Sequence, residues 1–327
     1  MSTPLLSIRG LRVGIPKRRG ADEIVRGVSL DVASGEKVGI VGESGSGKTL
    51  TMLSVTQLLP TPPLAVLGGE ILFDGEDVLK MDRRRLREVR GGEIAMVYQD
   101  PMSSLNPLLR VSTQIIEALR AHGTSKEAAR ERMREVLVQV GLQNPERVES
   151  SFPHQLSGGM IQRVMIAMAL STSPRVLVAD EPTTALDVTI QRQILELVDS
   201  LQATTHMAVL WVTHDLGVVA TLVDRVVVMY AGRIVEQAPT AQLFSRPTHP
   251  YTKALLESLP ELGSHHRSSL HQIGGTPPDA THLEVGCPFR ARCPYSVQRC
   301  SEAEPDLIDR GSGSFAACWR EPSEWTK

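Results

Sequence analysis

The sequence predicts an α/β protein in which a mostly parallel sheet is interrupted by a run of helices. Residues 37–42 form a short apolar segment, KVGIVG, that leads through a glycine-rich turn into a helical stretch. Residues 111–170 follow a helical pattern. Apolar segments at 176–180, 208–213 and 225–230 then alternate with helix-like stretches, which is typical of parallel sheets. We therefore expect a sheet domain with a helical insert.

The first part of the sheet domain is expected to combine strands with one helix. The strand at 37–42 precedes a helix at 48–59, which Pro60 should end because proline cannot continue a helix. Residues 70–77 alternate apolar and polar side chains around an Asp-Gly turn, and residues 93–99 are another strand candidate. The glycine-rich turn thus lies between a strand and a helix.

The helical insert carries its own boundary signals. Thr124 and Glu127 fit a capping box at a helix N-terminus, and Gly141 lies where a C-terminal cap belongs. Between them, Met133 and Val136 belong to a set of apolar residues that recur at helical spacing. At least one complete helix is therefore expected between residues 125 and 140.

Length and charge limit the classes of function. A chain of 327 residues accommodates one main domain and an appended module, since single domains usually contain about 100 to 200 residues. The net charge of −2, from 35 basic and 37 acidic residues, provides no global positive field for a nucleic-acid backbone. The run Arg83, Arg84 and Arg85, with Arg87 and Arg90, is interpreted as a solvated helix face. Nucleic acid is not expected as a partner.

The sequence also bears on the compartment. No uninterrupted apolar stretch approaches the about 20 residues that cross a bilayer. The first 20 residues carry arginines where a signal peptide would have its apolar segment. We expect a cytosolic chain that would serve a membrane process as a peripheral subunit.

The glycine-rich turn has the pattern of a phosphate-binding loop. The residues that fit G-x-x-x-x-G-K-[ST] are Gly42, Glu43, Ser44, Gly45, Ser46, Gly47, Lys48 and Thr49. Its glycines let backbone N–H groups surround a β-phosphate, Lys48 reaches the β and γ oxygens, and the Thr49 hydroxyl can ligate Mg²⁺. The alternative interpretation is an ordinary glycine-rich turn with an exposed lysine. It accounts less well for a strand directly before the motif and a helix directly after it. We expect an ATP and Mg²⁺ site here.

An acidic pair follows the strand at 176–180. Asp180 is placed to hold Mg²⁺ through water, and Glu181 is a candidate base that polarises the attacking water. By themselves, two acidic residues at the end of a strand are more often solvated side chains without a catalytic role. The significance of this pair comes from the phosphate-binding loop earlier in the chain.

Further motifs lie around this pair. They are Gln99 after a strand, Ser157, Gly158, Gly159 and Met160 within LSGGM, Ala185, Leu186 and Asp187 after the acidic pair, and His214 after WVT. In order, these resemble the Q-loop, the signature, the D-loop and the switch histidine of ABC cassettes. The resemblance covers roughly residues 5–245.

This resemblance implies a fold and an assembly. Residues 1–245 would form a P-loop NTPase cassette with a RecA-like core, an antiparallel β subdomain and a helical subdomain at about 105–170. The Ser157 hydroxyl and the Gly158 and Gly159 amides would bind the γ-phosphate held by a second cassette. Two homologous ATPase subunits are therefore expected to enclose two nucleotides head to tail.

The resemblance also implies roles for single residues. Gln99 would contact Mg²⁺ or the attacking water, and the loop that follows it would dock a cytoplasmic helix of a membrane subunit. His214 would donate a hydrogen bond to the transferring phosphoryl group. With Glu181 and His214 present, ATP hydrolysis is expected.

Two positions depart from the usual cassette pattern. The chain has no Phe, Trp or Tyr before Phe73, and the position that usually stacks adenine falls near Ile15. Apolar contact there would replace only part of the stacking. Met160 stands where the signature usually has glutamine, a replacement that is common among peptide-importer ATPases.

Residues 246–327 resemble the extension found on oligopeptide, dipeptide and nickel importer ATPases. The similarity rests on HPYTK at 249–253 and on CPFRARCP at 287–294. It implies an ATPase that energises import of di- or oligopeptides across the cytoplasmic membrane, with nickel or another small solute as the alternative and a soluble ABC ATPase as a further one. Expected partners are a second ATPase subunit, two transmembrane permeases and an extracytoplasmic solute-binding protein.

The extension also contains every cysteine of the chain. Cys287, Cys293, Cys300 and Cys318 are spaced C-x5-C-x6-C-x17-C, which departs from paired C-x2-C zinc ribbons. In a reducing cytosol, metal ligation is favoured over disulfides. Similar cysteines in the family hold a 4Fe-4S cluster, and all-cysteine ligation of such clusters tolerates irregular spacing. Zinc and unligated thiols remain alternatives.

Overall fold

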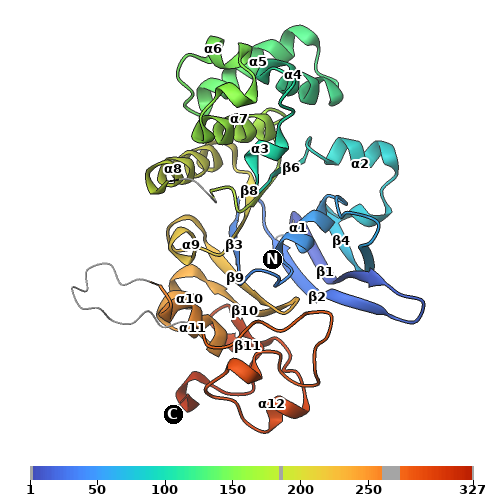
Figure 1. Cartoon of the computed structure of the whole chain (residues 1–327), viewed down its shortest axis with the longest axis vertical. Helices are drawn as coiled ribbons and strands as arrows, with labels where there is room; N and C mark the ends of the chain where they lie inside the picture. Colours follow the sequence, from blue (N-terminus) through green and yellow to red (C-terminus); the bar gives the residue numbers. More distant parts are fainter. Residues whose placement is uncertain (1–2, 184–186, 260–272, 326–327) are drawn as a thin grey trace, which may run out of the picture.

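The computed structural model describes residues 3–183, 187–259 and 273–325. Two sheets organise these residues (Figure 1). The smaller is antiparallel, has the strand order β2-β1-β4-β5, and consists of β1 (Leu6–Pro16), β2 (Ala21–Val32), β4 (Ala65–Phe73) and β5 (Glu76–Asp77). It corresponds to the antiparallel β portion expected of a cassette.

The larger sheet is mostly parallel and has the strand order β11-β12-β10-β9-β3-β8-β7-β6. Its strands are β3 (Lys37–Val41), β6 (Ile94–Val97), β7 (Val176–Asp180), β8 (Ala208–Thr213), β9 (Arg225–Tyr230), β10 (Arg233–Pro239), β11 (Ile308–Gly311) and β12 (Ser314–Ala316). Pairings from β9 to β6 are parallel, and those of β10, β12 and β11 are antiparallel. The strands predicted at 176–180, 208–213 and 225–230 are confirmed as β7, β8 and β9.

Two apolar cores lie on the two faces of this sheet. Val209 and Trp211 of β8 belong to the cluster that includes the helical insert, whereas Leu210 and Val212 belong to the cluster that includes the antiparallel sheet. Successive side chains of a strand point to opposite faces, so β8 contributes to both cores. Every residue of β8 is buried, which explains why this segment appears in the sequence as a continuous apolar run.

The helices cover the sheet and form the insert, which lies at the top of Figure 1 in green. They are α1 (Lys48–Val55), α2 (Arg83–Val89), α3 (Pro101–Ser104), α4 (Val111–Ala121), α5 (Lys126–Gln139), α6 (Pro145–Ser150), α7 (Gly158–Leu170), α8 (Val188–Thr205), α9 (Leu216–Leu222), α10 (Thr240–Ser245), α11 (Pro250–Glu257) and α12 (Arg299–Glu302). None of the helices in the described ranges has the length and apolar character that crossing a bilayer requires.

Some helix boundaries differ from the sequence prediction. The helix after the phosphate-binding loop ends at Val55 rather than at residue 59. Gln57 has a φ of +50°, and the Leu58 N–H donates to the Leu53 carbonyl at 2.8 Å, which closes the helix before Pro60. The capping box at Thr124 was a wrong prediction. Ser125 caps α5 instead, and its hydroxyl accepts a hydrogen bond from the Ala128 N–H at 3.3 Å.

The C-terminal end of α5 agrees with the sequence. Gly141 has a φ of +71° just after the helix, the left-handed conformation that glycine adopts without steric cost. Its predicted role as a C-terminal cap is confirmed.

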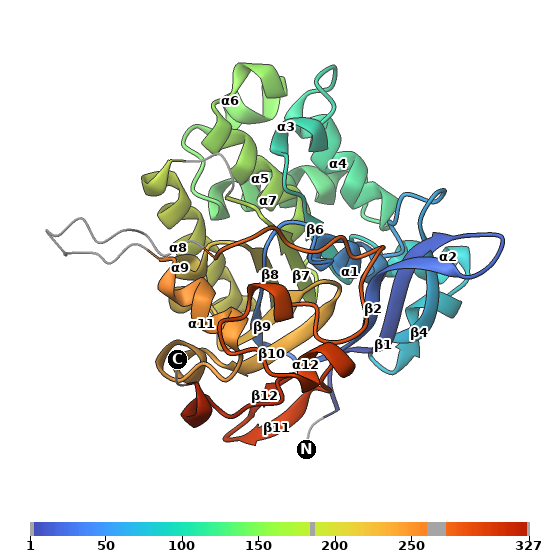
Figure 2. The same ribbon diagram turned by 60° about the horizontal axis from the view of Figure 1, so that its bottom comes forward.

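The residues after 245 continue the main sheet. β12 pairs with β10 through Glu236 and Ala316, and β11 pairs with β12. Figure 2 shows this region, in orange and red, packed across the end of the sheet next to β10. The loop-like stretch predicted at 265–282 lies partly outside the described residues. Its described part, from residue 273, runs toward the phosphate-binding loop.

Candidate active site

The phosphate-binding loop, residues 42–49, joins β3 to α1 in a path that only glycine permits. A Cβ atom on Gly42 would lie 2.2 Å from the carbonyl oxygen of Met229. Gly47, which precedes α1, has a φ of +96°, in the left-handed region that other residues rarely adopt. The loop can therefore approach its neighbours closely and turn its backbone N–H groups inward.

Lys48 is held inside this loop. Its side chain is buried, and Nζ donates hydrogen bonds to the carbonyl oxygens of Gly42 at 2.8 Å and Glu43 at 3.0 Å. Burial lowers the pKa of Lys48, and the carboxylates of Glu181, Asp180 and Glu43 oppose this shift. Phosphate oxygens would replace the two carbonyls as acceptors for this ammonium group.

Oxygen ligands for a hard cation meet between α1 and β7. The Thr49 Oγ1 and Asp180 Oδ1 atoms lie 3.2 Å apart. Asp180 is 3% exposed, and burial raises its pKa while the hydrogen bond from Thr49 opposes that shift. Hydroxyl and carboxylate oxygens together with phosphates are the ligands that Mg²⁺ prefers. These residues fit a Mg²⁺ bound with a nucleotide.

Glu181 lies at the centre of a hydrogen-bonded group. Its Oε2 accepts from Gln99 Nε2 at 3.1 Å, and its Oε1 lies 3.2 Å from His214 Nδ1. The three residues follow the parallel strands β7, β6 and β8, whose carboxyl ends lie at one edge of the sheet. The structure thus brings together the three predicted catalytic residues.

The backbone at Glu181 has an unusual conformation. Its φ of +45° is rarely adopted by residues with side chains, and such conformations cluster at functional sites. The Glu181 N–H donates to the Val212 carbonyl at 2.9 Å, which ties this conformation to β8. The carboxylate is thereby directed to the edge where Gln99 and His214 lie.

The signature residues begin a helix in the insert. Ser157 is exposed, and its Oγ accepts a hydrogen bond from the Met160 N–H at 3.4 Å at the N-terminus of α7. Asp187 plays the same local role for α8, accepting from the Ile190 N–H at 2.9 Å. Ala185 and Leu186, the other two D-loop residues predicted, lie outside the described residues.

Sequence patterns did not reveal that the C-terminal extension contacts the phosphate-binding loop. The Arg292 guanidinium forms a bidentate pair with Glu43, at 2.6 and 2.9 Å, and the Arg292 side chain is 5% exposed. The buried Tyr251 hydroxyl accepts a hydrogen bond from the Glu43 N–H at 2.9 Å. Glu43 occupies a variable position of the loop motif, so no local signal indicates these partners.

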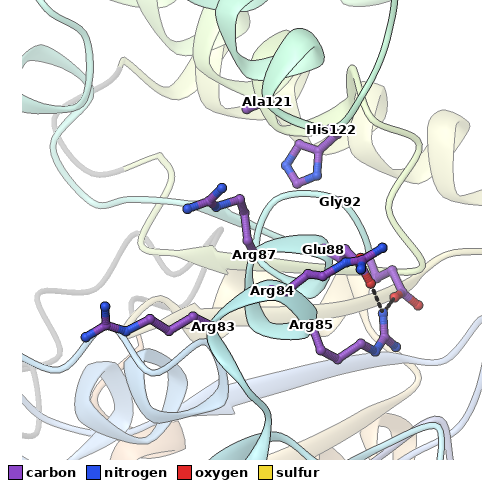
Figure 3. Close-up of a pocket in the computed structure, with 9 residues that line it drawn as sticks. Arg83, Arg84, Arg85, Arg87, Glu88, Gly92, Ala121 and His122 are labelled. Atoms are coloured by element: carbon purple, nitrogen blue, oxygen red, sulfur yellow. Dashed lines mark hydrogen bonds and ion pairs between the residues drawn. The ribbon is translucent and has the colours of Figure 1, made fainter.

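The predicted arginine-rich helix face lines a hollow of about 740 Å³ between α2 and the end of α4 (Figure 3). Arg83, Arg84 and Arg87 are exposed, as the sequence predicts. The prediction is wrong for Arg90, which is only partly exposed and donates hydrogen bonds to the carbonyls of Thr56 and Gln57. Figure 3 shows Arg85 turned toward acidic side chains, where it pairs with Glu93 at 2.5 Å. This hollow is not part of the nucleotide site.

The four cysteines line one small pocket in the extension. The Cys287 N–H donates to the Cys300 carbonyl at 2.8 Å, which joins two of the segments that carry them. Burial and the neighbouring thiols raise the pKa of Cys287 to about 12, and burial chiefly raises that of Cys293 to about 11. In the part of the chain that is described, no three or more His, Cys, Asp or Glu side chains are arranged to hold a metal ion.

Comparison with known protein families gives two matches. Residues 25–184 match the model described as ABC transporter. Residues 235–300 match the model described as the C-terminal region of oligopeptide/dipeptide transporters. Both parts of the chain are thus similar to parts of transport proteins.

Individual proteins match over almost the full length. A probable peptide ABC transporter ATP-binding protein of Sinorhizobium fredii is 49% identical over 97% of this chain and 95% of its own. An oligopeptide transport ATP-binding protein of Bacillus subtilis is 46% identical over 97% of this chain and 89% of its own. Among solved structures, a dimeric post-hydrolysis state of an ATP-binding cassette with ADP and Pi has a TM-score of 0.64 and 28% identity, covering 72% of this chain and 98% of that one.

Proposed function

This chain belongs to the ABC transporter family of ATP-binding proteins, and we propose that it hydrolyses ATP to energise the import of di- or oligopeptides across the cytoplasmic membrane. The observation that carries the proposal is the C-terminal region at 235–300, which is similar to that of oligopeptide/dipeptide transporters. The relatives described as oligopeptide and dipeptide transport ATP-binding proteins support the same cargo.

The proposed reaction is transfer of the γ-phosphoryl group of ATP to water. Lys48 and the backbone amides of the loop bind the phosphates, and Thr49 and Asp180 hold Mg²⁺, which when bound neutralises charge on the phosphate oxygens. Glu181 accepts a proton from the attacking water. His214 and Gln99 lie within hydrogen-bond distance of this carboxylate. They orient the water and stabilise the transferring phosphoryl group.

The assembly proposed for the chain needs a second cassette and membrane subunits. Residues 157–160 would complete the ATP site of a homologous partner, and Val188, next to Asp187 and 82% exposed, would lie at that interface. Met102 and Leu108 follow Gln99 and are 57% and 82% exposed. These side chains would receive a helix of one of two permeases at the cytoplasmic face, with an extracytoplasmic binding protein delivering the peptide.

For the cysteine pocket we propose a 4Fe-4S cluster held by Cys287, Cys293, Cys300 and Cys318. Four thiols line one pocket, and thiolate sulfur is the donor that such a cluster takes. In the described residues these side chains are not arranged to hold a metal ion, so binding would have to bring them closer together. Burial raises the pKa of these thiols. Because iron is bound by thiolates, binding of the cluster would have to release the thiol protons. Zinc and unligated thiols are the competing outcomes.

The metal proposal is tested on protein purified without oxygen. Iron and acid-labile sulfide in equal amounts, and their loss in Cys300→Ser, are expected. Zinc at one ion per chain, or no bound metal, would contradict the cluster.

The proposed cargo is tested on the complex purified with its permeases and binding protein. ATP hydrolysis is measured alone, with short peptides and with nickel. Stimulation by peptides is expected. Stimulation by nickel alone would favour a metal importer, and an unstimulated rate that needs no membrane subunit would favour a soluble ABC ATPase.

A further inference from the structure

A cavity of about 260 Å³ lies beside the phosphate-binding loop, and the C-terminal extension forms one of its walls. The lining consists of residues 43–46 of the loop, Ile24 from β2, Tyr230 and Ala231 from the end of β9 and the turn after it, and residues 277–281 of the extension. Its volume is close to the lower end of ligand pockets, about 300 to 1,000 Å³. The segment 277–281 is called the wall below.

We propose that the wall binds the ribose and adenine of ATP in place of the aromatic side chain that the chain lacks near Ile15. The proposal rests on the ATPase function proposed above. If the proposal holds, the nucleotide contacts two segments of one chain, residues 43–46 and residues 277–281, which are about 230 positions apart in the sequence.

The position of the cavity follows from how the loop binds phosphates. The β- and γ-phosphates lie against the loop amides and Lys48, so the α-phosphate and the nucleoside must leave along the flank of the loop. Residues 43–46, which form one flank of the loop, line the cavity. A nucleoside that left on this side would enter it directly.

The chemistry of the lining suits a nucleoside. Ile24, Pro277, Pro278 and Ala280 offer apolar contact to a base, and the ring of Tyr230 also lines the cavity. The acidic lining residues are Glu43, which is paired with Arg292, and Asp279, which accepts hydrogen bonds from Thr281. Thr281 adds a hydroxyl beside them. Apolar walls with a few polar groups are the usual composition of small-molecule pockets.

A single guanidinium holds the wall against the loop. Arg292 donates through both Nη atoms to Glu43 and through Nε to the Gly274 carbonyl at 2.9 Å, three residues before the wall. Its side chain is 5% exposed and lies over the rings of Tyr230 and Phe289. Because lysine lacks this planar fork, Arg292 is a positioning residue that lysine cannot replace.

The wall also has a fixed shape of its own. The Asp279 carboxylate accepts hydrogen bonds from the Thr281 N–H at 2.8 Å and the Thr281 hydroxyl at 2.7 Å. A turn closed in this way is ordered before a ligand arrives, which reduces the entropic cost of binding.

The test compares two probes that share phosphates but not a nucleoside. Binding of Mg-ATP and of inorganic tripolyphosphate is measured on the full chain with Pro277→Gly/Pro278→Gly. We expect the Kd for Mg-ATP to rise about tenfold through lost apolar contact, while the Kd for tripolyphosphate stays unchanged. Pro322→Gly, a single proline-to-glycine change in the same extension but outside the cavity, is the control and should alter neither Kd.

The outcomes separate this proposal from the function on which it rests. Equal ATP affinity in the wall variant and the native chain would contradict nucleoside binding by the wall and leave the proposed ATPase function unaffected. Failure of the native chain to bind Mg-ATP would overturn the ATPase proposal and the wall with it.

A second measurement needs no variant. An ATP analogue with a photoreactive azide on the base is cross-linked to the native chain in the presence of Mg²⁺, and the modified peptide is identified. Labelling within residues 277–281 is expected. Labelling confined to the segment around Ile15 would overturn the proposal.

Discussion

At the scale of single residues, Glu181 is the side chain on which hydrolysis is expected to depend most. It has both carboxylate oxygens in contact with polar partners and a backbone conformation fixed by β8. Loss of a general base typically slows a reaction about 100-fold to 10,000-fold. Of its neighbours, Gln99 has no group that can take a proton, and His214, whose imidazole could, is assigned to the transferring phosphoryl group.

The first prediction concerns Glu181→Gln. ATP turnover by the assembled complex should fall at least about 100-fold, because the amide cannot accept a proton, while the Kd for Mg-ATP changes little. Glu196→Gln on the exposed face of α8 makes the same chemical change away from the site and should leave turnover intact. An unchanged rate in Glu181→Gln would show that another group is the base.

Residues inside short motifs could be predicted from the sequence, whereas their distant partners could not. Lys48, Thr49 and Asp180 are identified by local spacing next to a strand or helix, and the structure places them together. Arg292 and Tyr251 reach Glu43 only through packing of the extension on the core. No periodicity or local spacing encodes a contact between residues more than 200 positions apart, as Arg292 and Glu43 are.

At the scale of elements, the turn between β9 and β10 is packed tightly against β2. Gly232 has a φ of +81°, and a Cβ atom there would lie 2.0 Å from the Ile24 carbonyl oxygen. Its N–H donates to the Ser46 carbonyl at 3.1 Å. This turn therefore supports both the antiparallel sheet and the phosphate-binding loop.

The second prediction compares two glycines with the same backbone conformation. Gly232→Ala should lower the free energy of unfolding by about 2 kcal/mol or more beyond the effect of Gly75→Ala. Gly75 has a φ of +82° with open space around it, so it controls for the left-handed conformation alone. Denaturant unfolding measures the free energy of unfolding of both variants. Equal decreases in the two variants would show that β2 can move away from the turn.

β10 also carries a buried carboxylate that orders the start of α11. Glu236 is 0% exposed and accepts hydrogen bonds from the Thr248 N–H at 2.6 Å, the Thr248 hydroxyl at 2.8 Å and the His249 N–H at 2.9 Å. Burial raises the pKa of Glu236, and these hydrogen bonds oppose the shift. The native state therefore favours the protonated form more than the unfolded state does.

The third prediction is the pH dependence of Glu236→Gln. The stability that Glu236 contributes is fully present below its ordinary pKa of 4.5 and is lost as pH rises through the raised value. Glutamine has no charge to bury, so the variant should gain stability relative to the native chain as pH rises. Denaturant unfolding near pH 4.5 and at about pH 8 measures this change, and a difference independent of pH would contradict it.

Strands were easier to predict than helix ends for a physical reason. β7, β8 and β9 are buried on both faces, so continuous apolar runs mark most of their length. The end of α1 is set by the left-handed conformation of Gln57, a residue type that gives no strong sequence signal for this conformation. β11 and β12 are short and partly polar, and they become strands only because β10 offers an edge.

At the scale of the whole molecule, the helical insert separates the signature from the loop of the same chain. Within the described residues, no hydrogen bond joins Ser157 to residues 42–49. The solved ATP-binding cassette to which this chain is similar is dimeric.

The fourth prediction tests that arrangement with Ser157→Arg. Nucleotide binding by the isolated chain should be unchanged, while ATP hydrolysis by the assembled complex should fall at least about tenfold, because a bulky side chain replaces the anion-binding hydroxyl. Ser125→Arg removes the equivalent N-cap from α5, at a similar cost of about 1 kcal/mol, without touching the signature. Weaker binding in the isolated chain would place the signature at its own ATP.

The sheet pairing of the extension bears on solubility as well as on nucleotide binding. An open strand edge is a template for pairing with other molecules, and proteins protect such edges with short, charged or covered strands. β12 covers β10, and the outermost strand, β11, is only four residues long and carries Asp309 and Arg310. A chain cut at residue 245 would leave β10 uncovered and Glu236 without its donors. We therefore expect the extension also to limit edge-to-edge aggregation at the β10 side of the sheet.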